Sequence, residues 1–194
     1  MEDGKVIRAF IAVEISAAVR AGLAKMQNVL REAGAHASWV KPENIHCTLV
    51  FLGDIFESAA GPLAEALPAA VENIGAFDVE IAGLGFFGTT RSPRIVWAGM
   101  AGNTGALGEL QQKTCEAAEA SGLSPDKKPF KPHLTIARVR SNRNAAELVR
   151  AIEKNREITF GTITVQRIVL MQSKLTAAGP EYTAIASIPL GKGD

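Results

Sequence analysis

Two short histidine motifs contain the residues best suited to chemistry in this 194-residue chain. The first reads HCTL from His46, and the second reads HLTI from His133. Both lie in apolar stretches that predict strands. Side chains alternate between the two faces of a strand, so each histidine shares a face with the threonine two residues later, Thr48 or Thr135. Each motif therefore offers an imidazole and a hydroxyl side by side, with an apolar layer behind them.

Two imidazoles that face one site are suited to general acid–base catalysis. With an ordinary pKa of ~6.5, one ring can be neutral and accept a proton while the other is protonated and donates one. The threonine hydroxyls could donate hydrogen bonds to the oxygens of an anionic centre between them. This set suits an in-line displacement at phosphorus without a metal ion. It suits acyl transfer poorly, because no serine or cysteine nucleophile lies beside the histidines.

Three other uses of these residues compete with acid–base catalysis. A single histidine in a strand is more often structural, but here the same pair occurs twice in matched settings, and His36 lies outside both. Neither motif has a further ligand at metal spacing, which predicts no metal site and no cofactor. Alternation turns Cys47 away from His46 and toward the core, so Cys47 and Cys115 are expected to be free thiols in a reducing compartment.

Local charge around the second motif favours a phosphate. Six basic residues and no acidic residue lie between positions 127 and 143. Arg138 has the best case for binding phosphate because it ends the motif strand, where the chain can bend, although straight alternation would put it opposite His133. A solvated surface is an equal alternative for Lys127, Lys128, Arg140 and Arg143; Lys131 completes the six.

Three aromatic residues near the motifs could stack on a nucleobase. They are Trp39, Phe51 and Phe130. Aromatic side chains are the usual stacking partners of unpaired bases in proteins that bind single-stranded nucleic acid. Core packing is nevertheless the favoured role for Phe51, since alternation places it with Cys47 on the face away from the histidine.

Strands and helices are interleaved around the motifs. Strands are expected at residues 6–15, 36–40, 45–52, 77–84, 94–100, 133–139, 158–171 and 182–190. Helices are expected at 17–34, 58–70, 103–122 and 145–154, the first of them capped by Ser16. Gly53 is expected to end a strand, Pro68 to limit a helix, and residues 85–93 to form a glycine-rich connection. The strands have alternating apolar residues, which predicts an α+β fold with largely antiparallel sheets.

The second motif begins 87 residues after the first, and the same offset aligns other features. Lys41-Pro42 falls on Lys128-Pro129, Ser16 on Asn103, and Phe10 on Trp97. The order of strand, helix, histidine strand, helix and strand repeats without a gap. We therefore expect an internal duplication within one bilobal domain spanning residues 1–194. Two similar lobes would be related by a pseudo-twofold axis, with two sheets lining a central cleft and helices packed outside.

Composition excludes several classes of protein. The chain has 21 basic and 20 acidic residues and a net charge of +1, so it is not a nonspecific binder of polyanions. No apolar run could span a bilayer, and the first ten residues lack the order of a signal peptide. The sequence predicts a cytoplasmic monomer without membrane contact.

The motifs and their flanks resemble those of the 2H phosphoesterases. The closest likeness is to the RNA 2′,3′-cyclic phosphodiesterases, which are also described as 2′-5′ RNA ligases. It covers almost the whole chain and includes RAFIAVEI, WVKPENIH followed by FLGD, PRIVWAG, FKPHLTIAR, and the final LMQSKL and GPEY. The resemblance implies a bilobal fold with a positively charged central cleft. It also implies metal-independent opening of a 2′,3′-cyclic phosphate at an RNA end to a 2′-phosphate.

Carried onto this sequence, the resemblance gives each motif residue a role. His46 would protonate the departing 3′ oxygen and His133 would activate water. Thr48 and Thr135 would donate to phosphate oxygens, and Arg138 occupies the family's arginine position after the second motif. The expected partners are RNA ends or nucleotides with a 2′,3′-cyclic phosphate. Two alternatives use the same residues: a module that binds RNA ends or nucleotides with little turnover, and 2′-5′ RNA ligation as the main activity.

Overall fold

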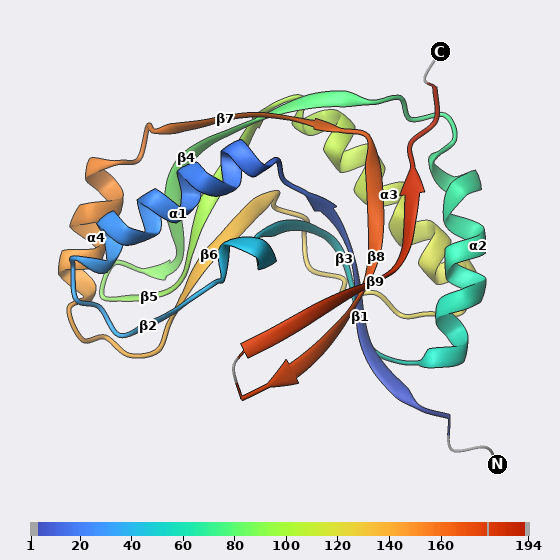
Figure 1. The fold of residues 1–194 in the computed structure, drawn as a ribbon, viewed down its shortest axis with the longest axis horizontal. Coiled ribbons are helices and arrows are strands. Elements are labelled where there is room, and N and C mark those ends of the chain that lie inside the picture. The colour runs from blue at the N-terminus through green and yellow to red at the C-terminus, as the bar shows by residue number, and fades with distance from the viewer. Residues whose placement is uncertain (1–3, 178, 193–194) are drawn as a thin grey trace.

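A computed structural model of the protein describes residues 4–177 and 179–192 and has the α+β architecture that the sequence predicts (Figure 1). The strands are β1 (Val6–Glu14), β2 (Ala37–Trp39), β3 (His46–Phe56), β4 (Phe77–Thr89), β5 (Ser92–Gly102), β6 (His133–Val139), β7 (Thr159–Val165), β8 (Arg167–Thr176) and β9 (Gly179–Pro189). The helices are α1 (Ala17–Arg31), α2 (Ala60–Val71), α3 (Thr104–Ala120) and α4 (Ala145–Lys154), with 3₁₀ turns at Pro42–Asn44 and Glu57–Ala59.

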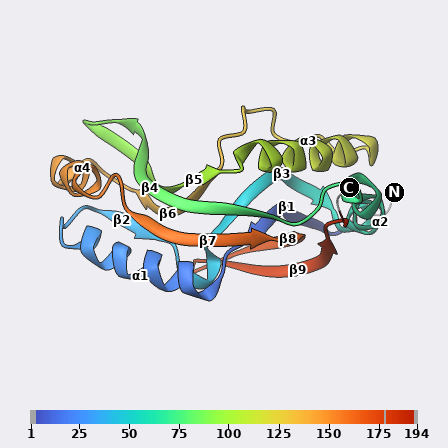
Figure 2. The same ribbon diagram turned by 90° about the horizontal axis from the view of Figure 1, so that it is seen from above.

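The strands form one curled antiparallel sheet rather than the two sheets that the sequence predicts (Figure 2). Its order is β7-β4-β5-β6-β3-β1-β8-β9, with β2 paired to β6. The two halves of the sheet are joined where β3 meets β6, and the only pair recorded there is Cys47 with Leu134. They form one sheet because the two histidine strands pair directly with each other. Helices α1 and α4 pack on the half that contains β4 to β7, and α2 and α3 on the other half (Figure 1).

The two sequence halves exchange strands. β4 follows α2 in the first half of the chain but pairs with β5 and β7, while β8 follows α4 in the second half but pairs with β1 and β9. Each half of the sheet therefore contains strands from both halves of the sequence. We propose on this ground that the chain forms a single domain, because neither sequence half could complete its sheet alone.

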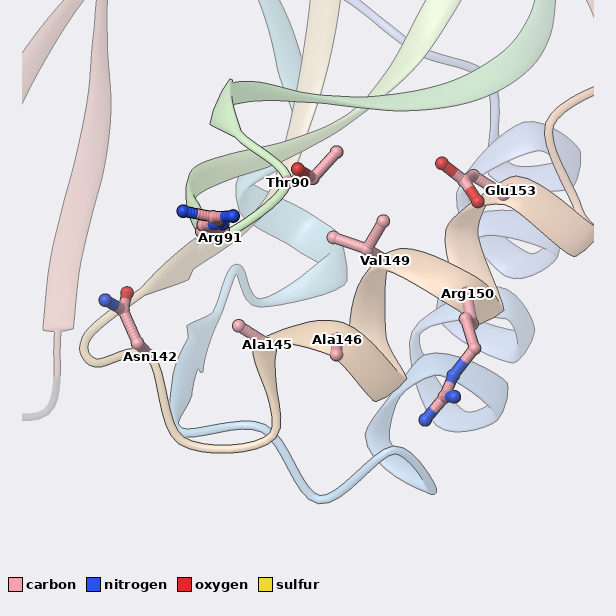
Figure 3. Close-up of a pocket in the computed structure, with 8 residues that line it drawn as sticks. All are labelled: Thr90, Arg91, Asn142, Ala145, Ala146, Val149, Arg150 and Glu153. Carbon is pink, nitrogen blue, oxygen red and sulfur yellow. The ribbon is translucent and has the colours of Figure 1, made fainter.

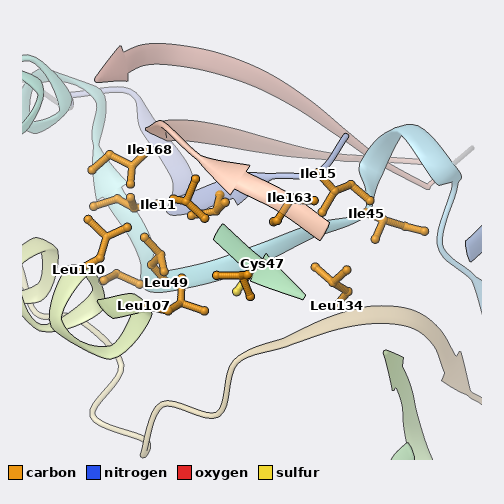
Figure 4. Packing of buried hydrophobic residues seen from close by; sticks show 14 of the residues in the cluster. Ile11, Ile15, Ile45, Cys47, Leu49, Leu107, Leu110, Leu134, Ile163 and Ile168 are labelled. Carbon is orange, nitrogen blue, oxygen red and sulfur yellow. The ribbon is translucent and has the colours of Figure 1, made fainter. Parts of the chain in front are cut away.

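The hydrophobic core lies between the sheet and the helices. Helix α1 begins at Ser16, whose side chain accepts a hydrogen bond from the backbone N–H of Val19 at 3.3 Å, and it buries an apolar stripe against the sheet. Figure 4 shows Cys47, Leu49 and Leu134 of the histidine strands in this core beside Leu107 of α3. The core thus fixes the back of both motif strands. Within residues 4–177 and 179–192, no helix is long and apolar enough to cross a membrane.

The predicted end of one strand was wrong, while the predicted end of one helix lies within one residue of the observed one. Strand β3 continues past Gly53 to Phe56, because Gly53 adopts a φ of 71° beside a register shift and lets the strand bend instead of ending. Helix α2 continues through Pro68 to Val71. Pro68 itself is exposed, and the buried residues on the other face of α2 include Leu67 and Val71, so tertiary packing outweighs the local cost of the proline.

The glycine-rich stretch at residues 85–93 is mostly strand rather than a connection. It completes β4 and begins β5, and the two strands form a hairpin that turns at residues 90 and 91. Gly85 pairs with Trp97, and a Cβ on Gly85 would lie 2.3 Å from Cζ2 of that indole. Gly88 has a φ of 111° at a second irregularity. These glycines serve close packing and a bend within strands, which composition alone does not distinguish from a loop.

Candidate active site

The two histidine motifs meet at the pair that joins the halves of the sheet. Cys47 of β3 and Leu134 of β6 are Cα partners in an antiparallel arrangement, and both are 0% exposed. They are also equivalent under the 87-residue offset. The pseudo-twofold axis of the duplication therefore passes between these two residues. Each neighbour of Cys47 in β3 has an equivalent neighbour of Leu134 in β6.

The four motif side chains lie together on the opposite face from this buried pair. Antiparallel register places Thr48 across from His133 and His46 across from Thr135. All four residues are partly exposed, while their neighbours in the strands are buried. We call the side of the sheet that carries these four residues the histidine face. The structure thus brings together the two imidazoles and two hydroxyls that the sequence placed 87 residues apart.

Both imidazoles are held in the same orientation. The Nδ1–H of His46 donates to the backbone carbonyl of Asn44 at 2.8 Å, and that of His133 donates to the carbonyl of Lys131 at 2.6 Å. A hydrogen bond of this kind fixes the tautomer and leaves Nε2 as the reactive nitrogen. Nε2 of His46 lies 3.0 Å from the hydroxyl oxygen of Thr48. Each motif therefore presents an Nε2 that can accept a proton when the ring is neutral and donate one when it is protonated.

Aromatic rings surround the two histidines differently. Phe10 stacks on His46 with centroids 4.8 Å apart and an interplanar angle of 21°, and Tyr182 of β9 approaches the same ring at 5.3 Å and 82°. His133 has one aromatic neighbour of this kind, Phe87, at 5.0 Å and 86°. His46 is therefore the more enclosed of the two rings.

Burial lowers the pKa of His46 below its ordinary value. The loss of hydration is the largest cause, and the positive charges of Arg138 and His133 act in the same direction. The hydrogen bond to the carbonyl of Asn44 opposes them, since it favours the charged ring. The two charged groups can act on His46 because both lie on the same side of the sheet, close to its ring. At neutral pH the unliganded protein therefore holds His46 mainly as the neutral imidazole.

A β-bulge turns Arg138 onto the histidine face. Two consecutive residues of β5 pair with Thr135 and Ala137, so Ile136 is an extra residue in β6. Ile136 and Ala137 are both buried, and the alternation restarts one position later with Arg138 exposed. Straight alternation would have put Arg138 opposite His133, but the strand bends before its end, as the sequence analysis expected for this residue.

An equivalent bulge turns Phe51 outward. Two consecutive residues of β1 pair with Thr48 and Val50, so Leu49 is an extra residue in β3. Val50 is 3% exposed, whereas Phe51 is 49% exposed and its ring centroid lies 6.4 Å from that of Phe10. The prediction that Phe51 packs in the core was therefore wrong. It lies on the histidine face at the position that corresponds to Arg138 in the other half.

The other two candidate stacking residues do not lie open for a base. Trp39 and Phe130 are partly buried against the core. The guanidinium of Arg31 covers the ring of Trp39 at 5.0 Å from its centroid. Of the three aromatic residues singled out in the sequence, Phe51 alone is exposed.

Two of the six basic residues around the second motif have local partners on the surface. All six are exposed. Lys128 forms an ion pair with Asp126 at 2.8 Å, and Nε of Arg140 donates to the hydroxyl of Ser38 at 2.7 Å. These two side chains therefore have local partners on the surface, while Arg138 has a place beside the imidazoles.

Neither cysteine is placed for nucleophilic catalysis. Cys47 and Cys115 are free thiols, as the sequence predicts. Burial raises the pKa of Cys47 to about 12, so this thiol stays neutral on the core side of β3. Within the described part of the chain, no three His, Cys, Asp or Glu residues gather into a group that could hold a metal ion.

A pocket of about 540 Å³ lies at some distance from the motifs, between the β4–β5 turn and helix α4 (Figure 3). Its lining consists of Thr90, Arg91, Asn142, Ala145, Ala146, Val149, Arg150 and Glu153. None of the motif residues contributes to it. The candidate site is the histidine face because both imidazoles and both threonine hydroxyls lie there. The pocket beside α4 is lined by none of these groups.

Three residues around the imidazoles were not predicted from the sequence. Phe10, Phe87 and Tyr182 come from β1, β4 and β9, far from either motif along the chain. The sequence signals for them were slight: Phe10 and Tyr182 belong to the segments RAFIAVEI and GPEY, and Phe87 to a stretch interpreted as a loop. Their contacts depend on strand order, which the sequence alone did not reveal.

Comparisons with known proteins place the chain in a family. Residues 16–176 match the model of the 2′-5′ RNA ligase superfamily. The RNA 2′,3′-cyclic phosphodiesterase of Aquifex aeolicus is 32% identical over 96% of this chain and 99% of its own length. The Archaeoglobus fulgidus protein of the same name is 35% identical over 91% of this chain and 96% of its own.

Solved structures show the same fold. The TT0787 protein of Thermus thermophilus superposes with a TM-score of 0.78 at 27% identity, covering 97% of this chain and all of the other. E. coli LigT in its apo form gives a TM-score of 0.77 at 22% identity, over 96% of this chain and 99% of its own. The paired histidine motifs, the α+β fold and these full-length similarities agree: the chain belongs to the 2′-5′ RNA ligase superfamily.

Proposed function

We propose that the protein is an RNA 2′,3′-cyclic phosphodiesterase that opens a terminal 2′,3′-cyclic phosphate to a 2′-phosphate without a metal ion. The observation that carries this proposal is the pairing of β3 with β6, which sets two imidazoles and two hydroxyls around one axis on an open face. The full-length similarity to curated RNA 2′,3′-cyclic phosphodiesterases supports it.

The proposed reaction is an in-line displacement between the two imidazoles. Nε2 of His133 takes a proton from water as the water oxygen bonds to phosphorus. The bond from phosphorus to the 3′ oxygen breaks, and Nε2 of His46 gives its proton to that oxygen. Thr48 and Thr135 donate to the non-bridging oxygens, whose negative charge grows in the transition state. The products are a 2′-phosphate and a 3′-hydroxyl.

Charge on the substrate prepares His46 for this role. Burial and the nearby positive charges favour its neutral form in the free protein. A phosphodiester anion bound beside the ring acts in the opposite sense and favours the imidazolium. His46 is thus expected to take up its proton as the substrate binds, so that acid and base are both in place only in the complex.

Arg138 and Phe51 break the symmetry of the site. They occupy equivalent positions in the two halves, but one carries a guanidinium and the other an exposed ring. A guanidinium suits the phosphate, and an aromatic face suits the terminal base. The difference gives a substrate one preferred direction across an otherwise paired set of catalytic groups.

Replacing Phe51 with Ala is expected to lower kcat/KM for adenosine 2′,3′-cyclic phosphate about 5- to 150-fold, mainly through KM, since base stacking contributes roughly 1–3 kcal/mol. Phe51→Tyr, which keeps the ring, should stay close to the parent protein. Phe56→Ala removes another exposed phenylalanine of β3 and serves as the matched control. An unchanged KM in Phe51→Ala would remove this residue from the binding site.

Product analysis and chelation test the proposed function directly. The protein is incubated with a short RNA that ends in a 2′,3′-cyclic phosphate, with and without excess EDTA, and the products are separated by chromatography. We expect a 2′-phosphate as the product and a rate that changes by less than about twofold with EDTA, because the acid and base are side chains. A 3′-phosphate product, or loss of activity on chelation that added metal restores, would contradict the proposal.

Two further results would redirect the assignment. Tight binding of cyclic and opened ends without any product would make the protein a binding module. Joining of the cyclic end to an RNA with a 5′-hydroxyl, with the joined form prevailing at cellular substrate levels, would make ligation the main reaction. Ligation opens the same cyclic phosphate with the 5′-hydroxyl of a second RNA in place of water, so the same residues serve both reactions. The nucleophile that ends up on phosphorus separates the two activities.

A further inference from the structure

The two catalytic histidines are equivalent in sequence but supported differently. Asn44 and Lys131 are related by the 87-residue offset, and each supplies the carbonyl that accepts from the following histidine. Beyond that shared bond, His46 has one ring stacked on its face and another at its edge, whereas His133 has a single edge contact. The stacked ring is Phe10 of β1, and the rest of the additional support for His46 comes from the C-terminal hairpin of β8 and β9.

This hairpin is attached to the first motif at two points. The side-chain amide of Asn44 donates to the carbonyl of Pro180 at 2.8 Å, while the carbonyl of Asn44 accepts from Nδ1 of His46. Two residues after Pro180, the ring of Tyr182 contacts both His46 at 5.3 Å and Phe10 at 5.1 Å. Asn44 thus links the hairpin to the Nδ1 edge of the His46 imidazole, and Tyr182 of the hairpin contacts the same imidazole directly.

We propose that Tyr182 is a positioning residue of the reaction, which holds the imidazole of His46 in the corner that its own ring forms with Phe10, so that the Nε2 edge faces the phosphate. A free histidine side chain turns about two torsions, and the Nδ1 bond alone still lets the ring tilt. The stack with Phe10 covers one face of the imidazole, and Tyr182, which meets the imidazole at 82° and also contacts Phe10, limits its movement on a second side. A displacement of about 1 Å at a catalytic group can cost about 100-fold in rate, so this restraint matters to turnover. This inference rests on the proposed function in that His46 takes part in the reaction.

The hydroxyl of Tyr182 is neutral while its ring holds His46 in place. Burial raises the pKa of Tyr182, against the opposing effect of Arg138 and Arg8, so the hydroxyl stays protonated at neutral pH. Arg138 and His133 of β6 are the charged or titratable groups that act on His46 itself, with Tyr182 on the β9 side. Because the ring of Tyr182 helps exclude water from His46, its removal should raise the pKa of His46 toward the ordinary ~6.5.

The test uses the full chain with three substitutions in the hairpin and its attachment. Tyr182→Leu removes the ring, and Tyr182→Phe keeps the ring and removes the hydroxyl. Asn44→Ala removes the hydrogen bond from the Asn44 side-chain amide to the carbonyl of Pro180 and leaves the rings of Tyr182 and Phe10 unchanged. Leu175→Ala is the matched control, because Leu175 lies on the same hairpin and is 72% exposed. For each protein, kcat and KM are measured on a cyclic-phosphate RNA end, and the imidazole of His46 is titrated by NMR in the free protein.

Tyr182→Leu is expected to lower kcat about 10-fold with less than about a threefold change in KM, and to shift the titration of His46 upward. Tyr182→Phe should recover most of that loss, and Asn44→Ala should change both readouts in the same direction as Tyr182→Leu but less. A Tyr182→Leu protein with unchanged kcat and an unchanged His46 titration would overturn the proposal. So would a Tyr182→Phe protein as impaired as Tyr182→Leu, because the hydroxyl rather than the ring would then be the active part.

The outcome stays interpretable if folding or activity fails. The resonances of His36 and His133 report whether Tyr182→Leu retains the native fold, and if it does not, Asn44→Ala decides the matter alone. If the parent protein shows no hydrolysis, the proposed function fails, yet the titration of His46 in the free variants still shows whether the hairpin controls that ring. The two failures are therefore distinguishable.

Discussion

Replacing either His46 or His133 with alanine is expected to lower kcat for hydrolysis of a cyclic-phosphate RNA end by about 100- to 10,000-fold, the usual range for one general acid or base. Each ring handles a different proton in the proposed reaction, so neither can substitute for the other. The double variant should be less impaired than the product of the single losses, because the two groups act in one transition state. Initial rates on a labelled oligonucleotide give the comparison.

His36 supplies the matched control for these variants. It is the third histidine of the chain, and its Nδ1 lies 3.2 Å from the hydroxyl oxygen of Ser141, outside both motifs. His36→Ala should therefore keep kcat within about twofold, the range expected of a surface change away from the reacting groups. Full activity in His46→Ala or in His133→Ala, with the fold intact, would end the acid–base assignment.

Local sequence patterns predicted most of the elements that position these histidines. The predicted strand at 133–139 and the predicted helix at 145–154 match β6 and α4, and Ser16 caps α1 as expected. The 87-residue offset anticipated a pseudo-twofold arrangement, and the pair of Cys47 with Leu134 lies on its axis. These features could be predicted because apolar alternation and helix caps are visible within a short segment, and an internal repeat is visible when the sequence is compared with itself.

Side-chain direction beyond the motifs could not be predicted in the same way. A single extra residue, Leu49 in β3 and Ile136 in β6, reverses the side chains that follow it directly, Phe51 in β3 and Arg138 in β6. Nothing in the apolar pattern marks these bulges, since Leu49 and Ile136 read as ordinary strand residues. For this reason Phe51 was assigned to the wrong face, whereas Arg138 was placed correctly only because a bend was expected at the end of its strand.

Long-range strand order was the other missing element. The exchange of β4 and β8 between the halves places Phe87 beside His133 and lets β9 bring Tyr182 to His46. Such pairings depend on how the whole sheet closes, and no local pattern around either motif encodes them. The aromatic surroundings of the site are thus a property of topology, whereas its acid–base groups are already visible in the sequence.

The bulge at Ile136 puts Arg138 on the histidine face, so its replacement should lower activity more than that of any residue other than the two histidines. Arg138→Gln is expected to lower kcat/KM about 100-fold, a loss of roughly 2.7 kcal/mol in transition-state stabilisation, because a charge-assisted contact to the phosphate is replaced by a neutral side chain. The same change removes a positive charge that lowers the pKa of His46, so that pKa should rise in the free protein. Steady-state kinetics and an NMR titration measure the two effects separately.

Arg140→Gln is the control that separates a specific contact from general basic charge. Arg140 lies two residues further along, is equally exposed, and binds Ser38. If Arg138 acts by its position on the histidine face, Arg140→Gln should cost less than about threefold, and Arg138→Lys should recover part of the loss because it restores the charge without the planar fork. Equal losses in Arg138→Gln and Arg140→Gln, both abolished by added salt, would instead mean that the basic loop attracts RNA as a whole and that the bulge has no catalytic consequence.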